Sequence, residues 1–357
     1  MKVLHVGAHD KLIFNYFVHL QADKVRFDYV LRSGGVDFHY KNDVRFNGKL
    51  FYITPLQHSV RKWIFELRDI ARKGEYDIIH LHIGWASIFG LVACYGIKSK
   101  LIIHNHNFHR SSSSLGSLIR RFIKFIYNQV EIGRMSCSES SGKQMFDKEY
   151  FILKNAVNYE DHMFSSIKRI DQRHALGITD QFVLVNIGNL HFQKNQIFLL
   201  HLTNYLVESG MKDIVLLIVG ADYGERQVLS NYVTDHSLQE YIKLCGSSDD
   251  VQAYLSAADV FLFPSLSEGF GMALLEAQIC GLRCLASKDL PRDAEITNNV
   301  KWLGIKDSDV KQWADAIIEM RKNGDYLFRR NVDFSKNYNI SEVSFELMNY
   351  YNQIIRN

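Results

Sequence analysis

The chain has 357 residues, of which 47% are hydrophobic and 23% are charged, and its formal net charge is +3. This length fits two domains of ordinary size, and the composition excludes a disordered chain. The longest uncharged stretch, residues 83–97, is shorter than the roughly 20 residues that span a bilayer, and no secretory signal core follows the N-terminus. We therefore expect a cytoplasmic protein without a transmembrane helix.

Charge is distributed unevenly along the chain. Residues 1–150 carry 22 Lys and Arg against 13 Asp and Glu, and residues 151–357 carry 20 against 26, so the two parts have net charges of +9 and −6. A basic first half indicates an anionic partner for that half. The five cysteines are odd in number and lack Cys-x-x-Cys spacing, which favours free thiols in a reducing compartment.

Short apolar runs alternate with helical segments in the first half. Strands are predicted at residues 3–6, 27–31, 50–53, 77–82 and 100–104, and helices at 59–73 and 87–95. This alternation is typical of a parallel sheet with helices on both faces.

Residues 102–107, Ile-Ile-His-Asn-His-Asn, end a strand at the edge where doubly wound sheets bind ligands. His104, His106 and His109 raise the question of a metal site. A His-x-His pair in an extended strand end offers no third ligand at an obvious spacing, and no Cys, Asp or Glu lies nearby in the sequence. We therefore expect no metal at these histidines.

The segment 113–135 predicts a helix in which apolar residues alternate with Arg120, Arg121 and Lys124. Two interpretations remain open. The apolar residues either enter a membrane surface while the cations meet anionic lipid, or they pack on the core beside a solvated basic edge. The basic first half slightly favours the membrane. Nucleic acid is not expected as a partner, because the sequence contains no nucleic-acid-binding motif.

The alternation of strands and helices restarts in the second half. Strands are predicted at residues 182–187, 214–219, 241–244, 260–263 and 283–286, and helices at 195–209, 224–236, 249–257, 272–280 and 310–321. Two successive α/β domains of similar size are therefore expected.

Residues 264–281 predict a loop that turns into a helix. Pro264 stops a buried strand, Gly269 and Gly271 allow a sharp turn, and Gly281 ends the helix. The first N–H groups of this helix, at residues 270–273, would form an anion site.

Two glutamates flank this anion site, Glu268 in the loop and Glu276 on the second turn of the helix. Carboxylates repel phosphate but accept hydrogen bonds from hydroxyls, so this arrangement suits a sugar nucleotide. The alternative is an ordinary strand, loop and helix of a doubly wound domain with both glutamates solvated.

The pattern Pro-Ser-x-x-Glu-Gly-Phe-Gly, with Glu-x7-Glu and a closing Glu-Ala-x-x-x-Gly, resembles the signature of the family 4 retaining glycosyltransferases. The resemblance implies the GT-B fold, with two doubly wound Rossmann-like domains facing each other across a cleft. Residues 1–162 would form the N-terminal acceptor-binding domain and residues 163–337 the C-terminal nucleotide-sugar donor-binding domain. The apolar spacing in 341–356 resembles the terminal helix that crosses back to the first domain, so 338–357 are assigned to it.

The resemblance also implies roles for single residues. Glu268, Lys194 and His106 would form the catalytic set, with Glu268 on hydroxyls of the donor sugar and Lys194 on the departing diphosphate. His106 would contact the sugar near its 6-hydroxyl, or would be a structural histidine bonded to backbone. Glu276 would bind the ribose hydroxyls. The implied donor-binding residues are Glu276, Asn189, Gly246, Gly269, Phe270, Gly271 and Met272.

Asn189 is a departure from the family pattern. The family places an Arg and a Lys five positions apart here, and Lys194 matches the Lys while Asn189 replaces the Arg. An amide donates a hydrogen bond but neutralises no charge. This departure supports a second hypothesis, a non-catalytic nucleotide-sugar-binding subunit of another transferase. A sugar-nucleotide epimerase is a more remote third hypothesis.

The activity implied is transfer of a hexose-type sugar, with retention, from a nucleotide diphosphate sugar to a hydroxyl of a glycan or lipid-linked glycan. We expect a UDP-sugar donor, a role in cell-surface polysaccharide or glycoconjugate biosynthesis, and peripheral attachment to the inner face of the cell membrane. No metal cofactor is expected. Asp307 and Asp309 form an Asp-x-Asp pattern, but their position before a helix favours capping over metal binding.

Overall fold

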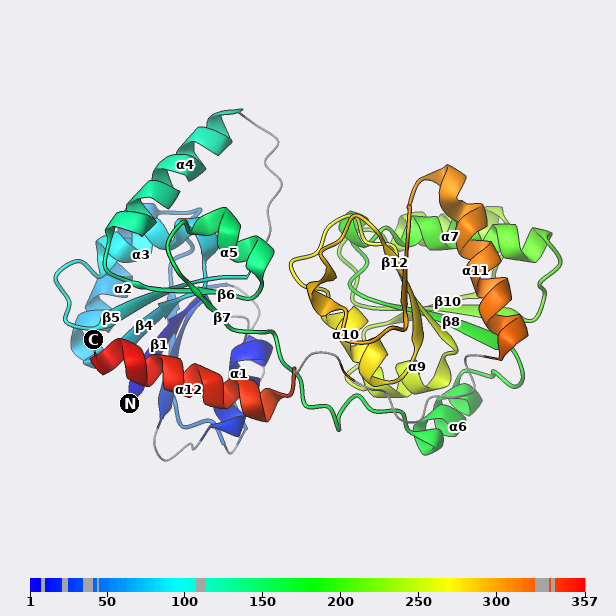
Figure 1. Cartoon of the computed structure of the whole chain (residues 1–357), viewed down its shortest axis with the longest axis horizontal. Helices are drawn as coiled ribbons and strands as arrows, with labels where there is room; N and C mark the ends of the chain where they lie inside the picture. Colours follow the sequence, from blue (N-terminus) through cyan, green and yellow to red (C-terminus); the bar gives the residue numbers. More distant parts are fainter. Residues whose placement is uncertain are drawn as a thin grey trace. The chain divides into compact units, whose positions relative to one another are not determined.

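The computed structural model describes residues 1–7, 10–20, 25–34, 41–43, 45–106, 114–324, 334 and 338–356. The chain divides into two compact units, shown in Figure 1. The first unit comprises Met1–Asn158 and Tyr338–Asn357, and the second comprises Tyr159–Asn337. The boundary lies four residues before the expected position at 162, and the chain returns to the first unit at the expected position. The facing arrangement of the two domains stays a prediction.

The described part of the first unit is built on a seven-stranded parallel sheet in the order β3-β2-β1-β4-β5-β6-β7. Its strands are β1 Lys2–Val6, β2 Arg26–Arg32, β3 Leu50–Ile53, β4 Ile78–Leu81, β5 Lys100–Asn105, β6 Gly133–Ser136 and β7 Phe151–Ile152. The strand order reverses between β1 and β4. Such a switch point is where doubly wound sheets hold ligands.

Helices cover both faces of this sheet. They are α1 Asp10–His19, α2 Val60–Gly74, the short 3₁₀ helix η1 Gly84–Ala86, α3 Ser87–Ala93, α4 Ser114–Gln129, α5 Glu139–Met145 and α12 Ile340–Arg356. One face packs against α1 and α12 around Phe17 and Leu347, and the other packs against α2 and α3 around Leu67 and Ala93. Figure 1 shows α12, in red, beside α1, in blue. The predicted return of the terminal helix is therefore confirmed.

The predicted helix 113–135 is too long. Residue 113 lies outside the described residues, α4 ends at Gln129, and β6 begins at Gly133. A Cβ added to Gly133 would lie 2.8 Å from Cγ1 of Ile102 and 3.2 Å from Oη of Tyr350. Only glycine therefore fits beside β5 here, and pairing of β6 with β5 overrides the local helical pattern.

The second unit contains a six-stranded parallel sheet in the order β10-β9-β8-β11-β12-β13. Its strands are β8 Phe182–Ile187, β9 Ile214–Val219, β10 Ile242–Gly246, β11 Val260–Phe263, β12 Arg283–Ser287 and β13 Val300–Leu303. Every residue of β8, β9 and β11 is buried, which explains their continuous apolar sequences. Here the strand order reverses between β8 and β11.

The helices of the second unit are α6 Ser166–Ala175, α7 Gln196–Glu208, α8 Arg226–Asp235, α9 Val251–Ala257, α10 Met272–Ile279 and α11 Val310–Asn323. Short 3₁₀ helices occur at η2 Phe192–Lys194, η3 Arg292–Ala294 and η4 Asp307–Asp309. The strands and helices predicted for this half are confirmed to within about two residues, whereas β13 and α6 were not predicted. Among the described residues, no helix combines the length and hydrophobicity needed to cross a bilayer.

Candidate donor site and histidine cluster

The turn from β11 into α10 depends on Gly271, the N-cap residue of α10. Its φ of +96° is one that side chains rarely adopt, and an added Cβ would lie 3.3 Å from Cε1 of Phe263. Phe270 is buried, so its side chain anchors the loop. The first N–H groups of α10, beginning with Met272, have no acceptor within the helix. An anion is therefore favoured at this helix start.

Lys194 and Glu268 meet directly. The Nζ atom of Lys194 lies 2.7 Å from Oε1 of Glu268, and the two side chains are 28% and 11% exposed. The two residues are 74 positions apart, and each lies in a loop that follows a strand at the switch point. The ammonium and the carboxylate predicted for the donor are thus brought together.

Two hydrogen bonds tie the Lys194 loop to the Glu268 loop. The backbone N–H of Leu266 donates to the carbonyl of Gln193 at 2.8 Å, and Nδ2 of Asn195 donates to the carbonyl of Pro264 at 3.2 Å. Asn195 has a left-handed φ of 54°, which turns the chain from η2 into α7. The Lys194–Glu268 pair is therefore held by the backbone as well as by its own charges.

The other predicted donor residues lie at the same edge of the second sheet, which is formed by the carboxyl ends of its strands. Asn189 is exposed just after β8, Gly246 ends β10 with a φ of +76°, and Gly269 is in the loop after β11. Glu276 is partly exposed on α10, one turn after Met272. The predicted donor residues therefore lie at one edge of the sheet, and their role in binding a donor stays a prediction.

Two further residues shape this edge: Gln196, which was not predicted, and Gly220, which was expected to close a strand at this edge but was given no role. The amide Nε2 of Gln196 donates to the carbonyls of Gly188 and Asn189 at 3.4 and 3.1 Å, which holds the turn after β8. A Cβ on Gly220 would lie 2.0 Å from the carbonyl oxygen of Gly188, so only glycine fits. The position of Gly220 directly after the apolar run of β9 was the available signal.

Asp307 and Asp309 form η4 immediately before α11. The carboxylate of Asp309 accepts a hydrogen bond from the backbone N–H of Lys306 at 2.9 Å, and the backbone N–H of Asp309 donates to the carbonyl of Lys306 at 2.8 Å. The Asp307 carboxylate lies 3.6 Å from Nδ1 of His201 and is 92% exposed. Asp309 thus occupies the N-cap position of α11, as its place in the sequence predicted, but its carboxylate bonds back to Lys306 and not to a backbone N–H of α11, so the expected side-chain cap is wrong.

The first unit contains a histidine cluster at its switch point. His5 lies in β1, His80 in β4 with His82 just after it, and His104 in β5 with His106 just after it. Alternate residues of a strand share one face, so these side chains project from the same face of three neighbouring strands. His109 lies outside the described residues.

The histidines contact one another through their ring nitrogens. Nδ1 of His5 lies 3.0 Å from Nε2 of His82, and Nδ1 of His82 lies 2.8 Å from Nε2 of His106. Burial lowers the pKa of His5 to about 3, and burial together with neighbouring histidines holds the pKa values of His80, His82 and His104 well below the usual value. These buried rings are therefore neutral at physiological pH.

The second unit is a doubly wound α/β domain, and the Lys194–Glu268 pair and the start of α10 lie at its switch point, the place where such sheets hold ligands. Residues 168–338 match the family model described as glycosyl transferases group 1. The match covers nearly all of the second unit, so this unit belongs to that family.

Curated relatives extend over most of the chain. A UDP-Gal:alpha-D-GlcNAc-diphosphoundecaprenol alpha-1,3-galactosyltransferase of Escherichia coli is 28% identical over 293 residues, covering 76% of this chain and 74% of the relative. The O-antigen biosynthesis glycosyltransferase WclY of Escherichia coli is 26% identical, covering 79% and 80%. The predicted family is thus confirmed, while the Glu-x7-Glu roles stay a prediction.

Solved structures share the fold. HepE of Anabaena in complex with UDP and glucose has a TM-score of 0.73 at 17% identity, covering 100% of this chain and 98% of that one. WaaG, a glycosyltransferase involved in lipopolysaccharide biosynthesis, has a TM-score of 0.71 at 14% identity, covering 99% of both chains. The predicted Rossmann-like α/β fold of each unit is confirmed.

Proposed function

We propose that this glycosyltransferase moves a hexose from a UDP-sugar, with retention and without a metal at the transfer step, to a hydroxyl of a lipid-linked glycan. The observation that carries the proposal is the Lys194–Glu268 pair, with Nζ and Oε1 2.7 Å apart, in the loops beside the start of α10. The names of similar proteins support this choice of substrates. One relative is a UDP-Gal:alpha-D-GlcNAc-diphosphoundecaprenol galactosyltransferase, and HepE, which shares the fold, was solved with UDP and glucose.

In this proposal the ion pair prepares both residues for the donor. The diphosphate, seated at the first N–H groups of α10, competes with Glu268 for the Lys194 ammonium. Once Lys194 turns toward phosphate, the Glu268 carboxylate is released to accept hydrogen bonds from hydroxyls of the sugar. Lys194 then neutralises the negative charge that grows on the leaving diphosphate.

Retention requires the acceptor to approach from the face that the diphosphate leaves. The bond from the anomeric carbon to the phosphate oxygen breaks, the bond to the acceptor oxygen forms, and the acceptor proton passes to a phosphate oxygen. No protein base is needed in this scheme.

A donor panel tests the proposal. We expect the purified chain to transfer from a UDP-sugar, and we expect Glu276→Ala to weaken UDP binding roughly 10- to 100-fold, because hydrogen bonds from hydroxyls to a charged group contribute about 1.5–3 kcal/mol. Mass detection follows transfer and titration calorimetry follows binding. Glu319→Ala is the matched control, because Glu319 is an exposed glutamate on α11.

The exposed amide of Asn189 favours one other candidate function, a nucleotide-sugar-binding subunit that does not catalyse transfer. That function is correct if UDP binds, binding depends on Glu276, and no UDP-sugar in the panel is hydrolysed or transferred. Conversion of the donor without any acceptor would instead indicate an epimerase.

We also propose that α4 attaches the first unit to an anionic membrane surface. Four large apolar residues of this helix are more than half exposed, namely Leu118, Ile119, Phe122 and Phe125. Tyr127 is buried in the core and Ile123 packs against it, so the core uses a different side of the helix.

An open hollow of about 510 Å³ beside Phe125 is lined by Arg121, Lys124 and Lys148, with Asp147 as its acidic residue. Apolar side chains beside cations fit the boundary between acyl chains and anionic headgroups.

Vesicle flotation tests this attachment. We expect the chain to float with anionic vesicles and much less with neutral ones. We expect Phe122→Ser with Phe125→Ser to weaken vesicle binding by about 100-fold or more, because each change loses roughly 1.5–3 kcal/mol of apolar burial. Phe65→Ser is the matched control, since Phe65 on α2 is equally exposed at 60%. Equal recovery with both kinds of vesicle, or recovery with neither, would exclude the attachment.

A further inference from the structure

We propose that His82, His104 and His106 bind a Zn²⁺ ion at the switch point of the first unit. One nitrogen of each ring lies within 4.8 Å of the corresponding nitrogen of the other two. Because the site lies in the first unit and Lys194, Glu268 and Glu276 lie in the second, the proposal does not depend on the proposed function.

The sequence argument against a metal here rested on the lack of a third ligand after His104 and His106. That argument fails, because the third ligand comes from the neighbouring strand. Residues 78–82 read Ile-Ile-His-Leu-His and residues 102–106 read Ile-Ile-His-Asn-His, so two adjacent parallel strands carry the same pattern. The register pairs His80 with Ile102, which brings His82 opposite His104.

His104 is the strongest indication of a ligand. Its side chain is fully buried, and neither Nδ1 nor Nε2 has a hydrogen-bond partner among the described residues. Buried polar groups nearly always have a partner, and a neutral imidazole binds metal through the nitrogen that carries no proton. The ring of His104 lies against that of His106, with centroids 3.8 Å apart. A metal bound at the nitrogen edges of the two rings would satisfy one nitrogen of His104.

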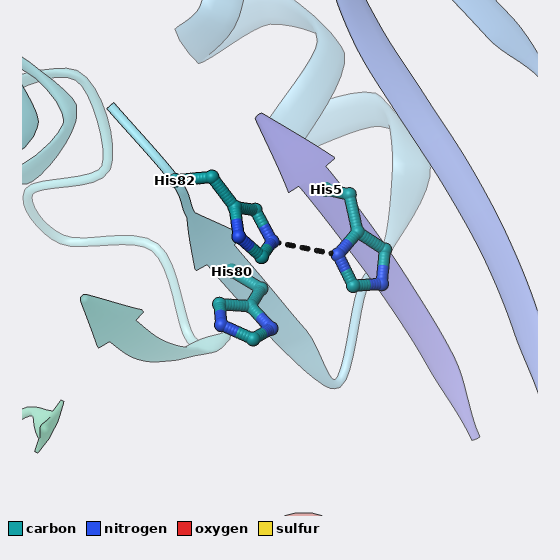
Figure 2. Close-up of side chains that lie close together, drawn as sticks. All are labelled: His5, His80 and His82. Carbon is teal, nitrogen blue, oxygen red and sulfur yellow. Dashed lines mark hydrogen bonds between the residues drawn. The ribbon is translucent and has the colours of Figure 1, made fainter. Parts of the chain in front are cut away.

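His82 is held in the orientation that a ligand needs. Figure 2 shows its ring meeting His5, with Nε2 of His82 3.0 Å from Nδ1 of His5. When Nε2 carries the proton and donates it to His5, Nδ1 is left with a lone pair toward His106, whose Nε2 lies 2.8 Å away. Zn–N bonds of about 2.0–2.1 Å at a tetrahedral angle place two nitrogens roughly 3.3 Å apart, so binding widens this separation by about 0.5 Å.

The chemistry of the three ligands selects the ion. Three imidazoles without a carboxylate suit Zn²⁺ and its transition-metal neighbours rather than Mg²⁺ or Ca²⁺, which require oxygen ligands. His106 is partly exposed, whereas His82 and His104 are buried, so metal enters past His106 and water can fill the fourth position.

A second group of three histidines, His5, His80 and His82, is less suited to binding a metal than His82, His104 and His106. Figure 2 shows these three rings together. All three are buried, with His5 and His80 fully so, which leaves no partly exposed member for metal entry. The Nδ1 atom of His80 lies 2.7 Å from the hydroxyl oxygen of Tyr351 on α12, so one of its nitrogens is already used.

Metal titration of the full chain without an affinity tag tests the proposal. After treatment with a chelator, we expect one equivalent of Zn²⁺ to bind, with a raised melting temperature, and Co²⁺ to give the visible bands of four-coordinate cobalt. Removing a residue that hydrogen-bonds to a metal ligand lowers metal affinity roughly 10- to 100-fold, so we expect that decrease for His5→Phe, which removes the partner of His82. Removing the ligand itself, in His104→Phe, should lower the affinity by about 100-fold or more. His80→Phe, a matched change in the same cluster, should keep the affinity.

Each outcome decides the proposal. Absence of a bound equivalent in the wild-type chain, or a His104→Phe variant that binds like wild type, overturns it. If Zn²⁺ binding is lost in His80→Phe and kept in His104→Phe, the ion binds to His5, His80 and His82 instead, and the proposal is overturned. Circular dichroism confirms that each variant is folded, and His58→Gln controls for binding by an exposed histidine. The wild-type titration decides the question even where a variant fails to fold.

Discussion

Replacing Lys194 by methionine is expected to lower the transfer rate by about 10²- to 10³-fold, the effect of removing one group that stabilises developing negative charge. Methionine keeps the apolar stem but removes the ammonium, and Asn189, the residue at the position of the usual arginine, supplies no charge in its place. The Glu268 carboxylate, at 11% exposure, also loses the cation 2.7 Å away and then repels the incoming diphosphate. UDP binding should weaken much less, because Glu276 and the start of α10 are unchanged.

Steady-state rates with a fixed donor and acceptor, together with UDP titration, measure this effect. Lys168→Met is the matched control, because Lys168 forms an ion pair of the same 2.7 Å length with Asp250 in the same unit. Lys194→Arg keeps the charge and should retain more activity than Lys194→Met. A Lys194→Met enzyme within a few-fold of wild type would remove Lys194 from the mechanism.

Replacing Asp259 by alanine is expected to destabilise the second unit by about 3 kcal/mol, the lower end of the range for removing one partner of a buried ion pair. The Asp259 side chain is 2% exposed, and its oxygens lie 2.7 Å from Nη2 of Arg169 and 3.0 Å from Nη2 of Arg173. It also accepts the N–H of Val183 at 2.8 Å, which joins it to β8. We expect the decrease in unfolding free energy to stay at the lower end of that range, because both arginines keep hydrogen bonds to the carbonyl of Ala257.

Native-state hydrogen exchange measures this change strand by strand. Protection of β8 and β11 should fall in Asp259→Ala, while β1 and β4 of the first unit should keep theirs. Asp315→Ala is the control, because Asp315 forms an exposed pair with Lys311 on α11 and such pairs contribute about 0.5 kcal/mol or less. Unchanged protection of β8 in Asp259→Ala would show that the two arginines do not need the carboxylate.

The donor half of the molecule was predictable because its signals are local. Buried parallel strands have continuous apolar sequences, so β8, β9 and β11 could be recognised without a structure. Gly271 is required by a backbone angle at its own position, and the start of α10 follows directly from it. Lys194 and Glu268 each follow such a strand, and strands that run parallel in one sheet bring their carboxyl ends to one edge.

The histidine cluster and β6 could not be predicted in this way. His82 and His106 are 24 positions apart, and nothing near either residue specifies that β4 and β5 pair in the register that joins them. Gly133 begins a strand because it pairs with Ile102 of β5, and Ile102 and Tyr350, both distant in the sequence, leave no room for a side chain there.

The amino-acid sequence by itself determined the two α/β units and the turn from β11 into α10 within residues 264–281, because apolar periodicity and turn chemistry act over a few residues. The tertiary structure alone decided which side chains from different strands meet. It paired Lys194 with Glu268, joined His82 to His104 and His106, and left the apolar side of α4 exposed. The physical reason is that sheet register and helix packing are set by long-range contacts, which no local pattern contains.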